Sequence, residues 1–595
     1  MLSANYRSLP TIEIDGQQNP PALMEDLLQV VVEESLHFPA AFTLVIQNDY
    51  QTGSGDRPWQ HQSLLQIGKP VKIGFVSSTI ESFDFSTSKQ GLLIEGEITA
   101  VETHFTEKTK APIIVRGYDA SHRLYRGRHN RSFQNITDSD IVKKIAGEAS
   151  LDLGTVDESG IPHDYVFQEN QTNLEFLRER AARIGFELFV QDGRLHFRRP
   201  KVDQELYLKW LKDIDSFRVR VTSAEQVQGV EVRAWDYGEK RAIVSTAARD
   251  DVLTETDNGK GSSSSTAFNG KPSQPTLIVV DQPVFNPKEA DAIAQARCDE
   301  LGGQFVQADA KGEGDPALRP GRVVTLQDLG PHSGRYYITE TRHSYRQRIY
   351  TTEFSVRGLR GSNLLTTLAP PPQLQPGQTL LVGVVTDNED PKGWGRVKVK
   401  FPTLTDDHAS NWARVVAIGA GPQRGFECLP EINDEVLVAF EHGDIHRPYI
   451  LGGVWNGQDQ PPNPVEANVQ TGKVRLRTFK TRTGHQLQFV EEEQRQSQSG
   501  IHLKTAGGHQ VHLNDSDGLI EIRTPGGQHL TLSDRTSTIQ INANAAINLT
   551  ASGVVAIAAS TIKLNAPLIT PTTPILTTPS PQIPNLKSKI QNPYG

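Results

Sequence analysis

The most regular pattern of hydrophobic positions lies near the end of the chain. Pairs of apolar residues that flank one polar or small residue recur eight residues apart at Ile539/Ile541, Ile547/Leu549 and Val555/Ile557. Upstream, similar pairs recur nine or ten residues apart. This spacing points both members of a pair to one face of a strand, so the pattern predicts a series of short strands. No such strand buries its apolar face alone, and the stacked repeats must share one core.

A second repeat lies between these predicted strands. The segment KTRTGHQL at 480–487 recurs as KTAGGHQV at 504–511 and, more loosely, as RTPGGQHL at 523–530. Its glycines fall between strands, where a tight corner needs a positive φ. The pattern therefore predicts strand, corner and strand in repeated succession.

We predict that residues 474–566 form an intertwined β-prism, or triangular β-helix, in which three chains each supply one wall. One apolar pair in eight residues is too thin a core for a single chain. An ordinary meander or sandwich is the alternative, and the sustained eight-residue repeat argues against it. The predicted trimer core consists of Ile501, Leu503, Val511, Leu513, Ile520, Ile522, Leu530, Leu532, Ile539, Ile541, Ile547, Leu549, Val555, Ile557, Ile562 and Leu564.

The rest of the chain predicts a mainly β, multidomain protein. Residues 1–365 alternate as strands do in several stretches, and they hold helical segments near 137–150, 173–185 and 287–301, which indicates an α+β domain with barrel-like subdomains. Residues 379–457 contain five short strands, which suits a small closed OB-fold barrel. Proline-rich linkers are expected at 366–378 and 458–473, and a proline-rich extended tail at 567–595.

Composition excludes several classes of protein. The formal net charge of −9 is mild, and no basic stripe with interleaved aromatic residues predicts a nucleic-acid partner. The two cysteines fit no metal spacing and give no disulfide framework. The N-terminus lacks the apolar core of a signal peptide and no run is long enough to span a bilayer, so we expect synthesis in the cytoplasm without a signal peptide.

No catalytic set emerges from the sequence, and we expect no enzymatic activity, no cofactor and no metal site. Gly53-Ser-Gly55 lacks the longer pattern of a nucleophile elbow, and the Gly259-Lys260 segment does not have the spacing of a phosphate loop. The histidines of the predicted prism could bind an ion if three copies of one of them faced inward. However, they lie at corners or at strand positions whose side chains point away from the predicted core. This favours the interpretation that they are exposed rim residues. These are His485, His502, His509, His512 and His529.

Three stretches, in this order, resemble one known family. They are NLEFLRERAARIGFELFVQDGRLHF at 173–197, DPKGWGRVKV at 390–399 and NDEVLVAFEHGDIHRPYILGGVWN at 433–456. With the repeats that follow, the chain is similar to the VgrG-type spike protein of contractile injection systems. That family joins a domain like a phage baseplate hub to an OB-fold and a β-prism needle. The family usually has Gly where this chain has Asn433, and because Asn tolerates the left-handed region, we expect the turn to survive.

The resemblance implies a non-enzymatic structural spike. It implies a homotrimer that centres the baseplate, matches a hexameric inner tube and perforates a target envelope when a sheath contracts. The implied partners are the inner-tube protein, baseplate components, a tip cap or cargo at the C-terminal tail, and, transiently, the target membrane; the implied location is a phage tail-like particle. Too few residues separate barrel from needle, or follow the needle, for a lysozyme or toxin domain. Two alternatives stay open: a cell-wall hydrolase with an active site in the hub, and a carbohydrate-binding fibre.

Overall fold

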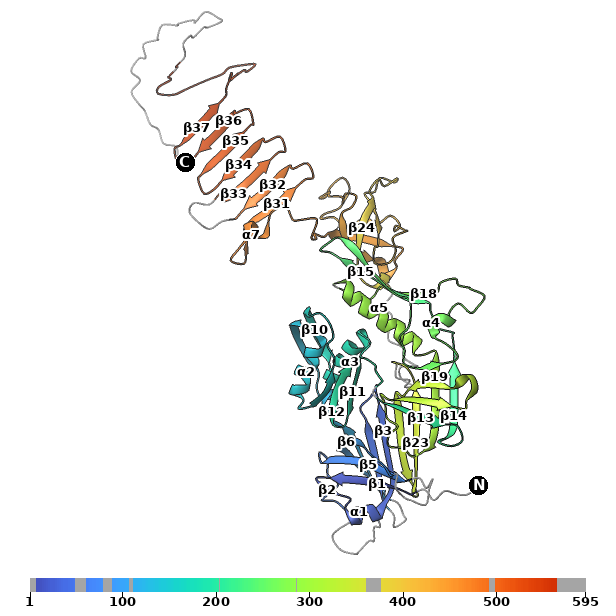
Figure 1. The fold of residues 1–595 in the computed structure, drawn as a ribbon. Helices are drawn as coiled ribbons and strands as arrows, with labels where there is room; N and C mark the ends of the chain where they lie inside the picture. The colour runs from blue at the N-terminus through green and yellow to red at the C-terminus, as the bar shows by residue number, and fades with distance from the viewer. Residues whose placement is uncertain are drawn as a thin grey trace, which may run out of the picture. The chain divides into compact units, whose positions relative to one another are not determined.

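The computed structural model describes residues 7–48, 60–78, 88–105, 111–202, 204–284, 286–359, 376–491, 498–563 and 565. The chain divides into two compact units, Met1–Gln460 and Pro461–Gly595 (Figure 1). The predicted linker 366–378 lies outside the described residues except for a 3-10 turn, η3, at Pro376–Gln378. The predicted tail 567–595 lies wholly outside them. The described residues include no helix with the length and hydropathy of a transmembrane span.

One eleven-stranded sheet forms the main part of the first unit. Strand β4 of this sheet alternates buried and half-buried positions, so it packs one face on a core. The sheet curls over two separate cores, one lined by Phe42 and Phe75 and the other by Phe354 and Tyr336. In spatial order the strands are β14 (Ile214–Val221), β19 (Val306–Glu313), β23 (Ile349–Val356), β22 (Glu340–Arg346), β3 (Leu27–Ser35), β4 (Ala41–Ile46), β7 (Ile113–Asp119), β6 (Ser88–Thr103), β5 (Pro70–Ser78), β1 (Arg7–Ile14) and β2 (Gln17–Gln18).

Two predicted helices pack against small sheets in a lobe with its own core. Helix α2 (Asp138–Glu148) begins after Thr137, whose hydroxyl accepts a hydrogen bond from the N–H of Asp140. Helix α3 (Asn173–Arg183) begins with a full capping box and ends before Gly185. The remaining elements of the lobe are η1 (Ala120–Tyr125), β8 (His129–Ile136), β9 (Asp152–Val156), β10 (His163–Gln171), β11 (Glu187–Gln191) and β12 (Arg194–Arg198).

The hairpin β11–β12 closes through a tight two-residue turn. Asp192 and Gly193 both have positive φ, 52° and 72°, which a two-residue type I′ turn requires.

The third predicted helix, α5 (Pro287–Gly302), covers a three-stranded sheet and buries Cys298. Both cysteines are free, Cys428 being exposed. The sheet consists of β16 (Arg241–Ala247), β15 (Gly229–Asp236) and β18 (Thr276–Val279). A four-stranded sheet consists of β13 (Glu205–Lys209), β20 (Val323–Gln327), β21 (Gly334–Tyr337) and β17 (Glu255–Thr256). Besides η1 and η3, the short helices described in the unit are α1 (Pro21–Asp26), α4 (Gly261–Ser264), η2 (Gly330–His332) and η4 (Glu441–Gly443).

The five strands predicted for the small barrel all form. Backbone bridges between Val397 and Ala413 connect the two edge strands, so the sheet closes on the core residues Val385, Val399 and Val438. Asn433 has φ 73°, which confirms that asparagine keeps the left-handed turn. In spatial order the strands are β25 (Lys398–Lys400), β24 (Leu381–Asp387), β27 (Glu435–Phe440), β28 (Pro448–Gly453) and β26 (Arg414–Val415).

The second unit contains a seven-stranded antiparallel meander in a single layer (Figure 1). It follows α7 (Val465–Asn468) and the short pair β29 (Val469–Gln470) and β30 (Lys473–Val474). Its strands are β31 (Leu476–Lys480), β32 (Gln486–Val490), β33 (Gly500–Lys504), β34 (Gln510–Asn514), β35 (Leu519–Arg523), β36 (His529–Ser533) and β37 (Thr538–Asn542).

The meander departs from the prediction beyond Asn542. Strands were expected at Ile547/Leu549, Val555/Ile557 and Ile562/Leu564, but residues 543–563 contain no strand and Leu564 lies outside the described residues. The reason is that a strand needs a hydrogen-bonded neighbour, and the described part of this single chain supplies none there. The structure is therefore mainly β and multidomain, with curled half-barrel sheets and an OB barrel, while one chain alone forms a meander rather than a prism.

Candidate assembly surface

The predicted core residues on the meander, together with three residues that the prediction omitted, Phe479, Leu487 and Phe489, form two columns on one face of the sheet. Every strand from β31 to β37 is five residues long, and its second and fourth residues point to that face. The register pairs the columns without a slip. One column is Phe489, Ile501, Leu513, Ile520, Leu532 and Ile539, and the other is Phe479, Leu487, Leu503, Val511, Ile522, Leu530 and Ile541.

This apolar face has no cover within the described part of the chain. Leu503 is 47% exposed, Ile522 42% and Ile539 70%, although these are the residues that the pattern places in a core. A soluble chain seldom exposes so long a contiguous apolar strip, and such strips mark interaction sites. Burying each Leu or Ile fully would contribute about 1.5–3 kcal/mol.

The corners between strands explain why the register does not slip. In the corner of 504–511, the Thr505 N–H donates to the His509 carbonyl (2.9 Å), the Gly508 N–H donates to the Thr505 carbonyl (3.0 Å), and the Thr505 hydroxyl accepts from the His509 N–H (3.1 Å). The corner of 480–487 repeats this pattern around Thr481 and Gly484. Each threonine thus closes its turn with its own side chain, and the recurrent sequence motif predicted a recurrent structure.

The opposite face of the sheet carries a polar column along the middle of the strands. It consists of Thr478, Gln488, His502, His512, Glu521, Thr531 and Gln540. Two of these residues correct the sequence prediction that the needle histidines are exposed rim residues: His502 and His512 are half-buried, with ring centroids 3.7 Å apart. His485 and His509 are exposed at corners, and His529 is half-buried beside Asn542.

The remaining members of the predicted core lie beyond the last strand. Ile547, Leu549, Val555, Ile557 and Ile562 are between 50% and 67% exposed. The structure therefore brings the members of the set up to Ile541 together on one surface and leaves the distal members without strand partners in this chain.

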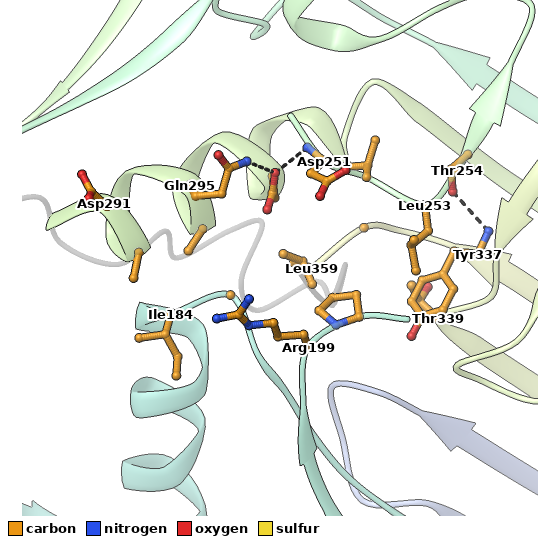
Figure 2. Close-up of a pocket in the computed structure, with 18 of the residues that line it drawn as sticks. Ile184, Arg199, Asp251, Leu253, Thr254, Asp291, Gln295, Tyr337, Thr339 and Leu359 are labelled. Atoms are coloured by element: carbon orange, nitrogen blue, oxygen red, sulfur yellow. Dashed lines mark hydrogen bonds between the residues drawn. The ribbon is translucent and has the colours of Figure 1, made fainter. Parts of the chain in front are cut away.

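The first unit contains a cavity of about 530 Å³ (Figure 2). It lies beside α5, and its wall includes Ile184, Leu253 and Tyr337, with Arg199 and Asp251. Among the described residues that line it there is no Ser, Cys or His, so these residues offer no nucleophile with an adjacent imidazole base.

One acidic residue of the cavity wall, Asp299, is held in place by hydrogen bonds within the chain. Asp299 accepts hydrogen bonds from the Asp251 N–H (2.6 Å) and the Gln295 amide (2.7 Å), which Figure 2 shows as dashed lines. Burial, with help from the neighbouring carboxylates, raises the pKa of Asp299. Both of these hydrogen bonds connect Asp299 to other groups of the same chain, the Asp251 backbone and the Gln295 side chain on α5. We therefore interpret Asp299 as a structural residue.

Comparison with known families gives two matches. Residues 10–347 match the family described as the Alg8 N-terminal domain, and residues 381–455 match the type VI secretion system/phage-baseplate injector OB domain. The first match covers more than half of the chain, and the second covers all of β24 to β28.

Curated relatives are similar over part of the chain. The actin cross-linking toxin VgrG1 of Vibrio cholerae is 28% identical over 39% of this chain and 22% of the relative. The type VI secretion system spike protein VgrG3 of Vibrio cholerae is 26% identical over 42% of this chain and 25% of the relative. The matched part of the chain thus spans a quarter or less of the length of these relatives.

A solved structure of Escherichia coli c3393 is described as a component of the type VI secretion system with structural similarity to the T4 bacteriophage tail proteins gp27 and gp5. It is 18% identical, covers 74% of this chain and 99% of its own, and has a TM-score of 0.38. A similarity at that level carries no argument alone.

Proposed function

Since the chain belongs to the Alg8 N-terminal domain family and is a VgrG-type spike or phage tail protein with a baseplate OB domain, we propose that it is the trimeric, non-enzymatic spike of a contractile injection apparatus. In this proposal the hub centres the baseplate and matches a hexameric inner tube. The needle perforates the target envelope when the sheath contracts. A tip cap or cargo binds at the C-terminal tail.

The single observation that supports the proposal is the uncovered apolar face of the meander. Its two columns run without interruption from β32 to β37. A closed prism of three such walls buries all three faces in one interior column and leaves no wall's apolar face in water. Unfolding one layer of strands in such a prism would expose the core residues of all three chains at once. Resistance to force would therefore be cooperative and would depend largely on the rate of unfolding.

The polar face fits the outside of such a prism. Its middle column contains no Phe, Tyr or Trp, and carbohydrate-binding surfaces commonly use aromatic stacking. This absence favours a mechanical needle over the carbohydrate-binding fibre.

Light scattering of the purified chain tests the proposal. The expected mass is three times 65.7 kDa, about 197 kDa. The pair Leu530→Glu and Ile541→Glu, which are directly opposed on β36 and β37, should lower it to the mass of one chain. Buried unpaired carboxylates are costly, and each site occurs three times around the axis.

A matched control lies one residue away on the same two strands. Thr531 and Gln540 also oppose each other directly, but on the polar face. The pair Thr531→Glu and Gln540→Glu should keep the trimeric mass. A wild-type protein that is stable as a single chain would overturn the proposal. A zymogram on peptidoglycan tests the hydrolase alternative, which clear lysis would establish.

A further inference from the structure

Two histidines face each other across neighbouring strands in the polar column. His502 on β33 is directly opposite His512 on β34. Their ring centroids are 3.7 Å apart and the ring planes are tilted by 54°. Directly opposed residues of an antiparallel pair interact most closely, so the backbone register itself holds the two imidazoles together.

Neither ring of the pair has a hydrogen-bond partner at Nε2. Both Nε2 atoms are buried and unpartnered in the structure. In contrast, Nε2 of His529 lies 2.8 Å from the Asn542 amide, and Nδ1 of His485 accepts a hydrogen bond from the Ala506 N–H. A buried polar atom without a partner costs about 1–3 kcal/mol, so two adjacent ones indicate a ligand that accepts both lone pairs.

The surroundings of His512 favour its neutral imidazole. Burial, followed by the neighbouring charge of His502, lowers the pKa of His512. The other charged groups that face His512 are Glu521, Arg523 and Asp517, and the Glu521 carboxylate already accepts from the Arg523 guanidinium (2.5 Å). A neutral imidazole is the form that ligates a transition metal.

We propose that His502 and His512 bind one late first-row divalent ion, Zn²⁺ or Cu²⁺, through their two Nε2 atoms. Tetrahedral Zn²⁺ with bonds of about 2.0–2.1 Å needs two nitrogens about 3.3 Å apart, and the two ring centroids are 3.7 Å apart. No three His, Cys, Asp or Glu side chains gather as a metal site in the described part of the chain, so water fills the remaining positions.

The proposed site does not depend on the trimer. It lies on the face opposite the two apolar columns, so closing the apolar face does not cover it. One ion per chain is expected whether the mass is that of one chain or of three.

The test is a titration of the metal-free full chain with Cu²⁺, which binds most tightly among these ions, followed by electron paramagnetic resonance. We expect one Cu²⁺ per chain with nitrogen coupling from two imidazoles, and displacement by excess Zn²⁺. His502→Gln and His512→Gln should each weaken binding at least tenfold. His509→Gln, at an exposed corner, is the matched control and should leave the affinity unchanged.

Two outcomes would overturn the assignment: unchanged Cu²⁺ affinity in both His502→Gln and His512→Gln, or an equal loss in His509→Gln. Light scattering of each metal-free variant shows whether the needle still folds. Zn²⁺ should raise the thermal midpoint of the wild type and of His509→Gln but not of the other two variants, and equal rises in all four proteins would also refute the site.

Discussion

At the scale of single residues, the first unit contains a buried polar cluster around Glu34 and Arg319. The Arg319 guanidinium is held by both carboxylate oxygens of Glu34, with Nη2–Oε1 at 2.7 Å, and also donates to Asp192 and to the Leu93 carbonyl. Beside it, the imidazole of His343 is completely buried. These residues connect segments that are far apart in the sequence, so no local pattern could have predicted them.

His343 should make the stability of the first unit depend on pH. Its Nε2 donates to the Leu318 carbonyl and its Nδ1 accepts from the Tyr350 hydroxyl, both at 2.9 Å. Burial lowers the pKa of His343 to about 3. Since the unfolded chain takes up the proton near pH 6.5 and the folded chain does not, the free energy of unfolding should fall by about 2 kcal/mol between pH 7 and pH 5.

Urea unfolding followed by hydrogen exchange at β22 measures this effect. His343→Gln removes the titrating group, so the variant should lose about 2 kcal/mol less than the wild type over the same pH range. An identical pH slope in both proteins would show that other groups, such as His37, whose pKa burial lowers to about 4, carry the dependence.

At the scale of elements, the corner of 504–511 gives a prediction about Gly508, and the adjacent Gly507 provides its control. Gly508 has φ +88°, and a Cβ there would lie 3.2 Å from Cγ of Pro525. Gly507 has no positive φ, and its Cβ would meet nothing closer than 3.9 Å. Gly508→Ala should therefore destabilise the needle by about 1 kcal/mol per chain, whereas Gly507→Ala should not.

Thermal unfolding of the two variants measures the difference. The midpoint should fall for Gly508→Ala and stay level or rise slightly for Gly507→Ala. Equal midpoints would mean that the corner tolerates an L-residue and that the glycine is not required by φ.

The sequence predicted helices and strands well where one short pattern determined both the spacing of the apolar residues and the adjacent turn or cap. The capped helices α2 and α3, the Asp192–Gly193 turn and the corners at Thr481 and Thr505 all rest on contacts within a few residues. The pairing of His502 with His512 was missed, because alternation predicts the face of a strand but not its register with the next strand. The prediction of strands beyond Asn542 was wrong for a related reason, because the described part of the chain offers them no hydrogen-bonded neighbour.

At the scale of the whole molecule, the exposed apolar pairs beyond Asn542 distinguish a prism from a free meander. A meander would continue by adding β-strands to its own edge, but the described residues after β37 form no strand while the eight-residue repeat goes on. In the proposed trimer, Ile547/Leu549 and Val555/Ile557 pair with the neighbouring chains, which supply the missing hydrogen bonds.

Hydrogen exchange of the distal segment tests this step directly. In the wild-type trimer, the amides of 547–557 should exchange at least a hundredfold more slowly than in the protein that carries Leu530→Glu and Ile541→Glu, because protection requires all three chains. The protein with Thr531→Glu and Gln540→Glu should retain wild-type protection. Rapid exchange at 547–557 in a protein of about 197 kDa would limit the prism to β31–β37 and would place the later repeats outside the needle core.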